Sequence, residues 1–325
     1  MLKISNLTVG YSRSLRPALN GVSLEVGTGE VVCVVGESGS GKSTLALACL
    51  RLLGSDVEIG GTIELDGRNI FSLSAAELRN VRGREIGFVN QDALSSFSAY
   101  WTVGEQIAET IEAHTNLPRR IAWERTLDQL ASVRIDNPER IARSYPHELS
   151  GGQRQRAALA MGLALRPRIL IADEPTSALD VTTASHLLAL LRQLQREYSI
   201  GVLLITHDLR VVEAVADRVA VMYAGILGEV GARDEVLRRP RFPYTRALID
   251  SLDLERARGS LKGVPGVPPG LSETLPGCPF APRCTRAEDI CQRMSPAPVT
   301  IGETVVRCHF PDSVEGVEVH VHSVG

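Results

Sequence analysis

The sequence lacks any long apolar run. Its longest stretches of this kind, such as VVCVV at residues 31–35 and VLLI at 202–205, are far shorter than the ~20 residues that a membrane-spanning helix needs. The first residues, MLKISNLTV, also lack the basic, apolar and small-residue regions of a secretory signal. We therefore expect a cytoplasmic chain that meets a membrane only as a peripheral protein.

Blocks of Lys and Arg are missing as well. The chain has 35 basic and 38 acidic residues and a net charge of −3, so its charge pattern shows no nucleic-acid footprint. Small anionic ligands are still compatible with this charge. The length of 325 residues, 44% of them hydrophobic, is enough for one large domain or two modest ones with their own cores.

Strand-like and helix-like segments alternate along the chain. Residues 30–35 (EVVCVV) are typical of a buried strand, and residues 44–54 have Leu and Ala at helical spacing with Gly54 as a stop. Residues 92–165 are mainly helical by periodicity, and two later apolar runs, RILIADE and GVLLITHD, are typical of parallel strands. This alternation predicts the α/β class.

A glycine-rich loop follows the first buried strand. GESGSGKST at residues 36–44 satisfies the pattern G-x-x-x-x-G-K-[ST] between a predicted strand and a predicted helix. Backbone N–H groups and the helix N-terminus would surround phosphates, Lys42 would add a point charge, and Ser43 would bind Mg²⁺. The predicted ATP-binding residues of this loop are Gly36, Ser38, Gly39, Ser40, Gly41, Lys42, Ser43 and Thr44.

Two adjacent acids end the apolar run near residue 173. Asp173 and Glu174 point in different directions at a strand end, so one can hold Mg²⁺ while the other reaches the attacking water. We assign the metal to Asp173 and the water to Glu174. His207 follows the next apolar strand, where a lone histidine is more often structural.

The stretch LSGGQRQR at residues 149–156 identifies the kind of phosphate-loop protein. With this motif the chain resembles the ATP-binding subunits of ABC transporters, and the resemblance covers residues 1 to about 235. The matching positions are the signature (Ser150, Gly151, Gly152, Gln153), the Q-loop glutamine Gln91, the D-loop aspartate Asp180, the switch histidine His207, and Tyr11 at the place of the adenine-stacking aromatic residue.

The resemblance implies a mechanism shared between two subunits. The signature of one subunit closes on ATP held by the other, in a head-to-tail dimer. Glu174, His207 and Gln91 become the catalytic group, and Ser43, Gln91 and Asp173 become the Mg²⁺ ligands. The implied fold is a P-loop NTPase (RecA-like) core over residues 1–239, with an inserted helical subdomain at about 92–165.

Four of the six cysteines crowd into the tail, at Cys278, Cys284, Cys291 and Cys308. Disulfides are not expected in a reducing compartment. Four thiolates in a Pro-rich segment with little core would suit tetrahedral zinc or a [4Fe–4S] cluster, and their spacing does not separate the two. Cys33 and Cys49 are expected to be core residues.

The tail also resembles a particular branch of the family. RPRFPYTRALIDS followed by GCPFAPRC is similar to the C-terminal extension of the dipeptide/oligopeptide and nickel importer group, here residues 240–325. Members with a [4Fe–4S] cluster at these cysteines favour iron over zinc. The resemblance implies ATP-driven uptake of di- or oligopeptides with two transmembrane permease subunits, a second ATP-binding subunit (a paralogue is favoured) and an extracytoplasmic solute-binding protein.

Two alternatives stay open. The same ATPase could drive the uptake of nickel or another small solute. The group's usual proline after the Q-loop is Ala93 here, and SFSAYW at residues 96–101 replaces the usual turn, which leaves the importer subtype open. A soluble ABC-type ATPase acting on nucleic acid is the second alternative, although that class should show basic patches. Phe97, Tyr100 and Trp101 could pack inside the helical subdomain or face a membrane partner.

Overall fold

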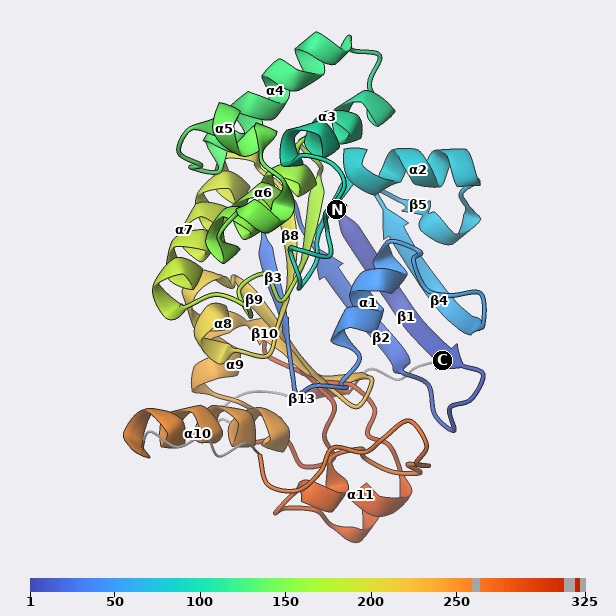
Figure 1. The fold of residues 1–325 in the computed structure, drawn as a ribbon. Helices are drawn as coiled ribbons and strands as arrows, with labels where there is room; N and C mark the ends of the chain where they lie inside the picture. The colour runs from blue at the N-terminus through green and yellow to red at the C-terminus, as the bar shows by residue number, and fades with distance from the viewer. Residues whose placement is uncertain (259–263, 313–318, 322–325) are drawn as a thin grey trace. The chain divides into compact units, whose positions relative to one another are not determined.

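The fold comes from a computed structural model, which describes residues 1–258, 264–312 and 319–321. The chain forms two compact units. The helical unit comprises residues 1–2, 26–31 and 68–205, and the phosphate-loop unit comprises residues 3–25, 32–67 and the described part of 206–325. Figure 1 labels the elements of both units, and each unit is described separately below.

Parallel strands form the centre of the helical unit. β7 (Ile169–Asp173) pairs in parallel with β6 (Ile86–Val89) on one side and with β8 (Gly201–Thr206) on the other. Every residue of β7 and β8 is buried, as expected for parallel strands covered on both faces. The apolar runs RILIADE and GVLLITHD therefore form the strands that the sequence predicts.

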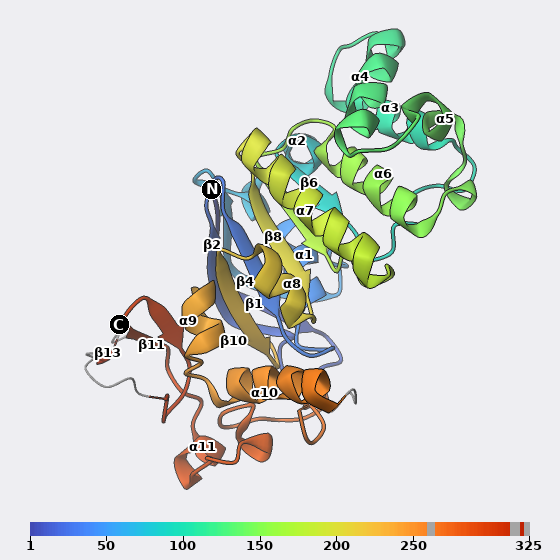
Figure 2. The ribbon, with the colours of Figure 1, turned by 90° about the vertical axis from the view of Figure 1, so that its left-hand side faces the viewer.

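Helices make up most of the remaining helical unit. Figure 2 shows α3, α4, α5 and α6 gathered as a cluster. Residues with hydroxyl side chains begin several of these helices: Thr102 and Ser150 each form a capping box with the third residue of α3 and α6. The helices and the short strand of this unit are α2 (Ala75–Arg84), α3 (Val103–His114), α4 (Arg119–Ser132), α5 (Pro138–Arg143), α6 (Gly151–Leu163), α7 (Val181–Tyr198) and β5 (Arg68–Asn69).

The phosphate-loop unit contains parts of two sheets. β2 (Leu19–Val26), β1 (Leu2–Tyr11) and β4 (Val57–Leu65) lie side by side in one sheet. In the other, β3 (Val31–Val35) pairs in parallel with β9 (Arg218–Tyr223), and antiparallel pairs continue through β10 (Ile226–Ala232), β12 (Thr304–Val306), β11 (Val299–Ile301) and β13 (Val319–Val321). Its helices are α1 (Lys42–Cys49), α8 (Leu209–Val215), α9 (Arg233–Arg238), α10 (Pro243–Arg258) and α11 (Asp289–Arg293).

Helix α1 ends earlier than its sequence pattern predicts. Arg51 takes a left-handed conformation with φ of 51°, and Leu52 N–H donates to Leu47 O at 2.8 Å while Arg51 N–H donates to Ala48 O at 2.9 Å. These two bonds form a Schellman motif, which usually has glycine in the left-handed position. The prediction that Gly54 stops the helix was therefore wrong, because an arginine adopts the terminating conformation first.

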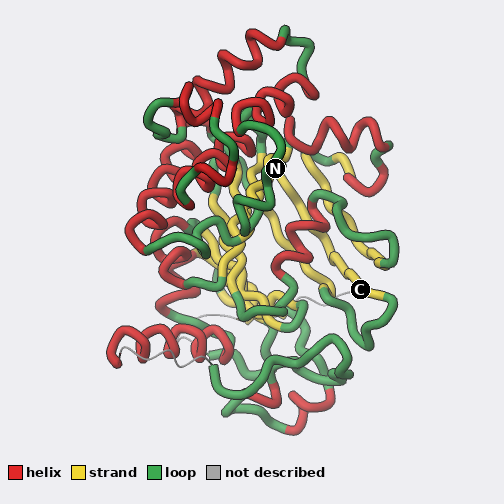
Figure 3. Tube along the Cα trace, viewed as in Figure 1, coloured by secondary structure: helices red, strands yellow, loops and turns green. Residues whose placement is uncertain are grey.

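The part of the C-terminal extension that follows α10, residues 264–312, contains little regular structure. Residues 264–280 form neither helix nor strand, as their Pro and Gly content predicts, and Figure 3 draws this region mainly as loop. An aromatic cluster packs it onto β9 and the start of α10 within the same unit: the Phe280 ring lies 5.3 Å from that of Tyr223, 5.4 Å from Tyr244 and 6.0 Å from Phe242, centroid to centroid. Such edge-on pairs stabilise beyond their buried area.

Candidate nucleotide-binding site

The phosphate loop wraps around its own lysine. Lys42 is buried, and its Nζ donates to Gly36 O at 2.8 Å, to Glu37 O at 2.9 Å and to Ser40 Oγ at 3.5 Å. The ammonium group is therefore held inside the loop by its carbonyl groups. This arrangement keeps a positive charge at the start of α1, where phosphates bind.

Helix α1 begins without a side-chain cap. Gly41 precedes it with φ of 107°, a conformation that side chains rarely adopt, and a Cβ there would lie 2.7 Å from Ala18 O. Gly36 is equally restricted, since its Cβ would lie 2.1 Å from Met222 O. The glycines let the backbone fold tightly, and the first N–H groups of α1 have no side-chain cap.

Two residues far along the chain, which no sequence motif predicts, hold Glu37, the second residue of the loop. Glu37 N–H donates to Tyr244 Oη at 2.9 Å, and the Glu37 carboxylate forms a two-pronged ion pair with Arg283. Tyr244 and Arg283 are more than 200 positions away in the chain. The only local signal was an acid inside an anion-binding motif, which requires a cation nearby.

Two of the predicted catalytic residues meet in the helical unit. Gln91 Nε2 donates to Glu174 Oε2 at 3.2 Å, and Asp173 is buried at the end of β7. Glu174 has φ of 46°, a left-handed conformation that costs energy in a residue other than glycine and often marks functional sites. The Glu174 N–H donates to Ile205 O at 2.8 Å, which holds this strained turn on β8.

The signature and the D-loop lie together in the same unit. Ser150 caps α6: its Oγ accepts from Gln153 N–H at 3.3 Å, and Gln153 Oε1 accepts from Ser150 N–H at 3.0 Å. A Cβ on Gly152 would lie 2.8 Å from Thr183 Cγ2 at the start of α7, so any side chain at this position would require Thr183 to move. Asp180 caps α7, where it accepts hydrogen bonds from the N–H and hydroxyl of Thr183.

The remaining predicted residues lie at strand or helix ends of the phosphate-loop unit. Tyr11 is half-buried at the end of β1, and His207 is exposed directly after β8. Ser43 is exposed on the first turn of α1. The predicted ATP-site residues thus fall in both units, where they lie in loops, at strand ends or in the first turn of a helix.

The four tail cysteines surround one small cavity. Cys278, Cys284, Cys291 and Cys308 line it together with Phe242, Pro243, Phe280, Ala281, Arg286, His309 and Phe310. Cys278 N–H donates to Cys291 O at 2.7 Å, and Gly277 allows this approach because a Cβ there would lie 2.2 Å from Cys291 O. The structure therefore brings together the four thiols that the spacing grouped.

These thiols do not form a metal-binding arrangement as they stand. All six cysteines are free, and within the described ranges no three or more His, Cys, Asp or Glu side chains are placed to hold a metal ion. Burial raises the pKa of Cys278 and of Cys284, and raises that of Cys308 to about 11. A metal would have to displace their protons, so the predicted [4Fe–4S] or zinc centre has only the shared cavity in its favour.

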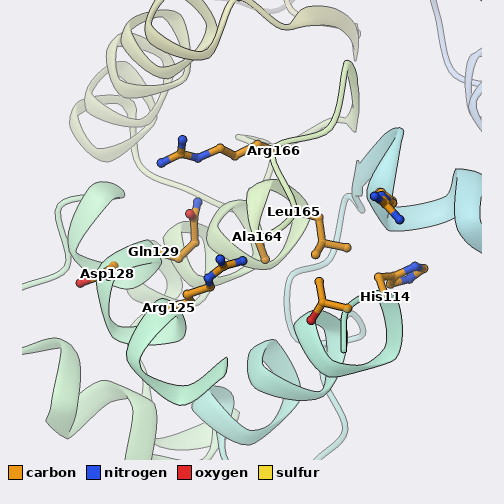
Figure 4. A pocket seen from close by; sticks show the side chains of 9 residues that line it. His114, Arg125, Asp128, Gln129, Ala164, Leu165 and Arg166 are labelled. Atoms are coloured by element: carbon orange, nitrogen blue, oxygen red, sulfur yellow. The ribbon is translucent and has the colours of Figure 1, made fainter. Parts of the chain in front are cut away.

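A larger basic cavity lies elsewhere in the helical unit. It measures about 490 Å³ and is lined by Arg84, His114, Thr115, Arg125, Asp128, Gln129, Ala164, Leu165 and Arg166 (Figure 4). None of these is a predicted site residue. α2 ends at Arg84, α3 at His114 and α6 at Leu163, and the partial negative charge of helix C-termini stabilises nearby cations. His114 does not add to this positive charge, because burial and the nearby Arg84 lower its pKa. The basic character of the cavity comes from the three arginines in its lining.

The fold and the glycine loop define a P-loop nucleotide-binding protein with an added helical cluster. Comparison with known proteins agrees. Residues 19–177 match the family described as "ABC transporter", and residues 229–291 match the family described as "Oligopeptide/dipeptide transporter, C-terminal region". A dimeric ATP-binding cassette solved in a post-hydrolysis state with ADP and Pi is similar in structure, with a TM-score of 0.64, 30% identity, and coverage of 72% of this chain and 99% of that one.

Curated relatives extend the match over most of the chain. A probable peptide ABC transporter ATP-binding protein of Sinorhizobium fredii is 47% identical over 287 residues, which is 87% of this chain and 86% of that protein. The oligopeptide transport ATP-binding protein OppD of Escherichia coli is 41% identical over 299 residues, 91% and 89% of the two chains. The chain belongs to the ABC transporter family and is an ABC ATPase. Among the described residues, no helix is both long and apolar enough to cross a membrane.

Proposed function

We propose that this chain is the ATP-hydrolysing subunit of an ABC importer and that it energises the uptake of di- or oligopeptides. One observation carries the proposal: a matched ABC transporter segment and a matched oligopeptide/dipeptide C-terminal region occur in order in one chain. The peptide-transport relatives cover most of this chain and most of their own length. We propose the domain boundary at residue 240, between the cassette and the extension.

The phosphate loop binds ATP, with Tyr11 against the adenine. Lys42 contacts the phosphates, and residues 36–44 supply backbone donors at the start of α1. Ser43, Gln91 and Asp173 hold Mg²⁺. The exposed hydroxyl of Ser43 at the first turn of α1 and the contact between Gln91 and Glu174 support these assignments.

Hydrolysis depends on Glu174, His207 and Gln91. Glu174 orients or deprotonates the attacking water, His207 contacts the γ-phosphate, and Gln91 links the nucleotide state to the membrane partner. The left-handed φ of Glu174 and its fixed backbone N–H support a positioned side chain. In the closed state ATP contacts both subunits, and hydrolysis removes contacts and reopens the pair.

Two surfaces of the chain indicate the partners that we propose: the signature helix start at Ser150 and the exposed aromatic residues after the Q-loop. The signature at Ser150 meets ATP on a second ATP-binding subunit, which we propose is a paralogue; the similar cassettes of known structure were solved as dimers. After the Q-loop, Phe97 is buried, whereas Tyr100 is 88% exposed and Trp101 is 58% exposed. These two aromatic residues suit docking to two permease subunits at the cytoplasmic face of the membrane, which receive solute from an extracytoplasmic binding protein.

We further propose that the four tail thiols hold a metal centre that staples the extension. Their position around one cavity supports it, and a centre of this kind would supply a cross-link where little core exists. Iron–sulfur and zinc are separated by anaerobic purification followed by analysis for iron, acid-labile sulfide and zinc. Iron with sulfide and broad visible absorption supports the cluster, zinc alone supports the alternative, and neither metal rejects both.

Reconstitution tests the main proposal. The chain is co-expressed with two candidate permease subunits and a candidate second ATPase, and the complex is placed in proteoliposomes with a candidate solute-binding protein. We expect ATP-dependent uptake of a labelled oligopeptide, abolished by Glu174→Gln. Uptake of a nickel chelate without peptide uptake would favour the nickel alternative. Co-purification with nucleic acid and no permease would favour the soluble ATPase.

A further inference from the structure

The C-terminal extension contacts Glu37 of the phosphate loop through two side chains, those of Arg283 and Tyr244. Arg283 Nη1 donates to Glu37 Oε2 at 2.6 Å, and Arg283 Nη2 donates to Glu37 Oε1 at 3.0 Å. Tyr244 Oη accepts from Glu37 N–H at 2.9 Å. A guanidinium fork on a carboxylate fixes both orientation and distance. The side chain and the backbone of one loop residue are therefore both held from outside the loop.

Arg283 is itself locked in place. Its Nε donates to Pro265 O at 2.8 Å, its Nη2 also donates to Val264 O at 2.6 Å, and its Nη1 also donates to Tyr223 Oη at 3.1 Å. With the two bonds to Glu37, all five N–H donors of the guanidinium have an acceptor. The Arg283 side chain is 4% exposed, so its position before ATP arrives is fixed by the extension.

Glu37 needs this partner because of where it stands. It lies in a loop that collects backbone N–H groups around a polyanion, and an uncompensated carboxylate there would repel a triphosphate. The Glu37 carbonyl also accepts from Lys42 Nζ at 2.9 Å and from Ser40 N–H at 3.2 Å. Movement of Glu37 would therefore displace the lysine that contacts the phosphates.

We propose that Arg283 is a positioning residue of the ATP site, which neutralises Glu37 and fixes the phosphate loop in its ATP-binding form. The inference rests on the proposed ATP binding by this loop. It gives the extension a direct role in nucleotide affinity, because the turn Ala281–Arg283 delivers the guanidinium to the loop. The folding of the extension and the ATP-binding conformation of the phosphate loop are therefore coupled through Arg283.

A double-mutant cycle on ATP affinity tests the proposal. Dissociation constants of Mg-ATP are measured by calorimetric titration for the full chain, Arg283→Ala, Glu37→Gln and the double variant. Loss of hydrogen bonds to a charged group predicts roughly ten- to hundredfold weaker binding for Arg283→Ala. In the Glu37→Gln background, the same Arg283→Ala change should cost less than about threefold, because no carboxylate remains to neutralise.

A matched variant controls for general damage to the extension. Arg246 also pairs within the extension, with Asp312 at 3.7 Å, and its Nη2 donates to Pro240 O at 3.4 Å, but neither contact involves the phosphate loop. Arg246→Ala should leave ATP affinity within about twofold of the parent, since exposed ion pairs contribute little. Arg283→Lys, which keeps the charge without the fork, should fall between the parent and Arg283→Ala.

The outcomes separate the possible explanations. Equal losses for Arg283→Ala in both backgrounds, with a lowered melting temperature, would mean a purely structural arginine and overturn the proposal, as would unchanged affinity. If Arg283→Ala does not fold, Arg283→Lys carries the same cycle with Glu37→Gln, and the loss must again shrink in that background. A parent chain that does not bind ATP, or Lys42→Ala that binds as well as the parent, would instead reject the proposed function.

Discussion

Two helix starts in this chain are both built from glycine and serine, yet they differ in how their backbone donors are satisfied. Helix α1 begins after Gly41 with no side-chain cap, and the buried Lys42 supplies a cation. Helix α6 begins after Ser150 with a complete capping box to Gln153. The backbone donors at the start of α1 are thus left without a side-chain partner, whereas those at the start of α6 are capped within the same helix. In our proposal the first start binds the ATP of its own subunit, and the second meets the ATP of a partner subunit.

The broadest expected effect comes from removing the cation at the start of α1, because this change should impair both ATP binding and hydrolysis. Lys42→Ala deletes a buried ammonium group that three loop oxygens surround. We expect both ATP binding and hydrolysis to fall by roughly 100-fold or more, since charge-assisted bonds to phosphate are strong. Nucleotide titration and phosphate release measure the two quantities. Near-parental ATP affinity would show that the loop does not depend on Lys42.

Glu174→Gln should separate binding from chemistry. Hydrolysis should fall by about 10²–10⁴-fold, the usual contribution of a general base, while ATP affinity stays near that of the parent. The amide keeps the shape of the side chain, so its contact with Gln91 at 3.2 Å can be retained. Single-turnover hydrolysis and ATP titration on the same preparation check both halves. Hydrolysis at the parental rate would reject Glu174 as the residue that acts on water.

Ser150→Ala tests whether the start of α6 has a different role from the start of α1. Loss of the cap should lower the free energy of unfolding by about 1 kcal/mol, and ATP affinity of the isolated chain should not change. Steady-state hydrolysis in the assembled complex should fall, because our proposal places the altered residue against the partner's nucleotide. Denaturant melts, ATP titration and ATPase assays together test this pattern. Weaker ATP binding by the isolated chain would contradict the separation of roles.

Lowering the pH should reduce the stability contributed by the charged cap of α7, Asp180, and should leave that of the uncharged cap of α6, Ser150, unchanged. The Asp180 carboxylate caps α7, and the hydrogen bonds from Thr183 lower its pKa below the ordinary value of 3.8. Its folded-state pKa is depressed, so the stability it contributes is present above pH ~3.8 and is lost as the pH falls through the lower folded value. An NMR titration of the Asp180 carboxyl group measures its pKa in the folded protein and so checks the direction of the shift. An Asp180 pKa at or above 3.8 would contradict it.

Substitutions at the two helix caps, Asp180 on α7 and Ser150 on α6, supply the controls for this pH effect, which is the smallest of those expected. Asp180→Asn keeps a capping oxygen without a titrating charge, so the part of the acid destabilisation that comes from Asp180 should disappear in that variant. Ser150 does not titrate in this range, so Ser150→Ala should lower stability equally at pH 7 and at a pH below 3.8, where the Asp180 contribution is being lost. A pH-dependent effect of Ser150→Ala would show that the α6 start senses a nearby charge.

Local motifs in the sequence predicted the parts of the site that depend on neighbouring residues. The phosphate loop, the signature and the acids after β7 each occupy a contiguous stretch, and their strand and helix contexts follow from apolar periodicity. The sequence grouped the four cysteines, and the structure places them around one cavity. The helices α3 to α6 occupy residues 103–163, and the subdomain boundary at about 92–165 stays a prediction.

Contacts between distant parts of the chain were not predictable in this way. Nothing near Glu37 indicates that Arg283 lies beside it, because 245 residues separate the two and the pair depends on the aromatic packing of Tyr223, Tyr244 and Phe280. The end of α1 was also missed, since an arginine took the left-handed position expected of glycine. Such choices depend on tertiary energy, which a local pattern does not contain.

The most direct test of the shared-site account is the structure of the Glu174→Gln complex with its second ATP-binding subunit and bound Mg-ATP, determined by electron cryomicroscopy. We predict that the triphosphate on residues 36–44 of one subunit contacts the signature serine of the other, so that Ser150 of this chain meets the ATP of its partner. ATP bound in the loop with Ser150 facing solvent, and no second subunit across from it, would contradict the account.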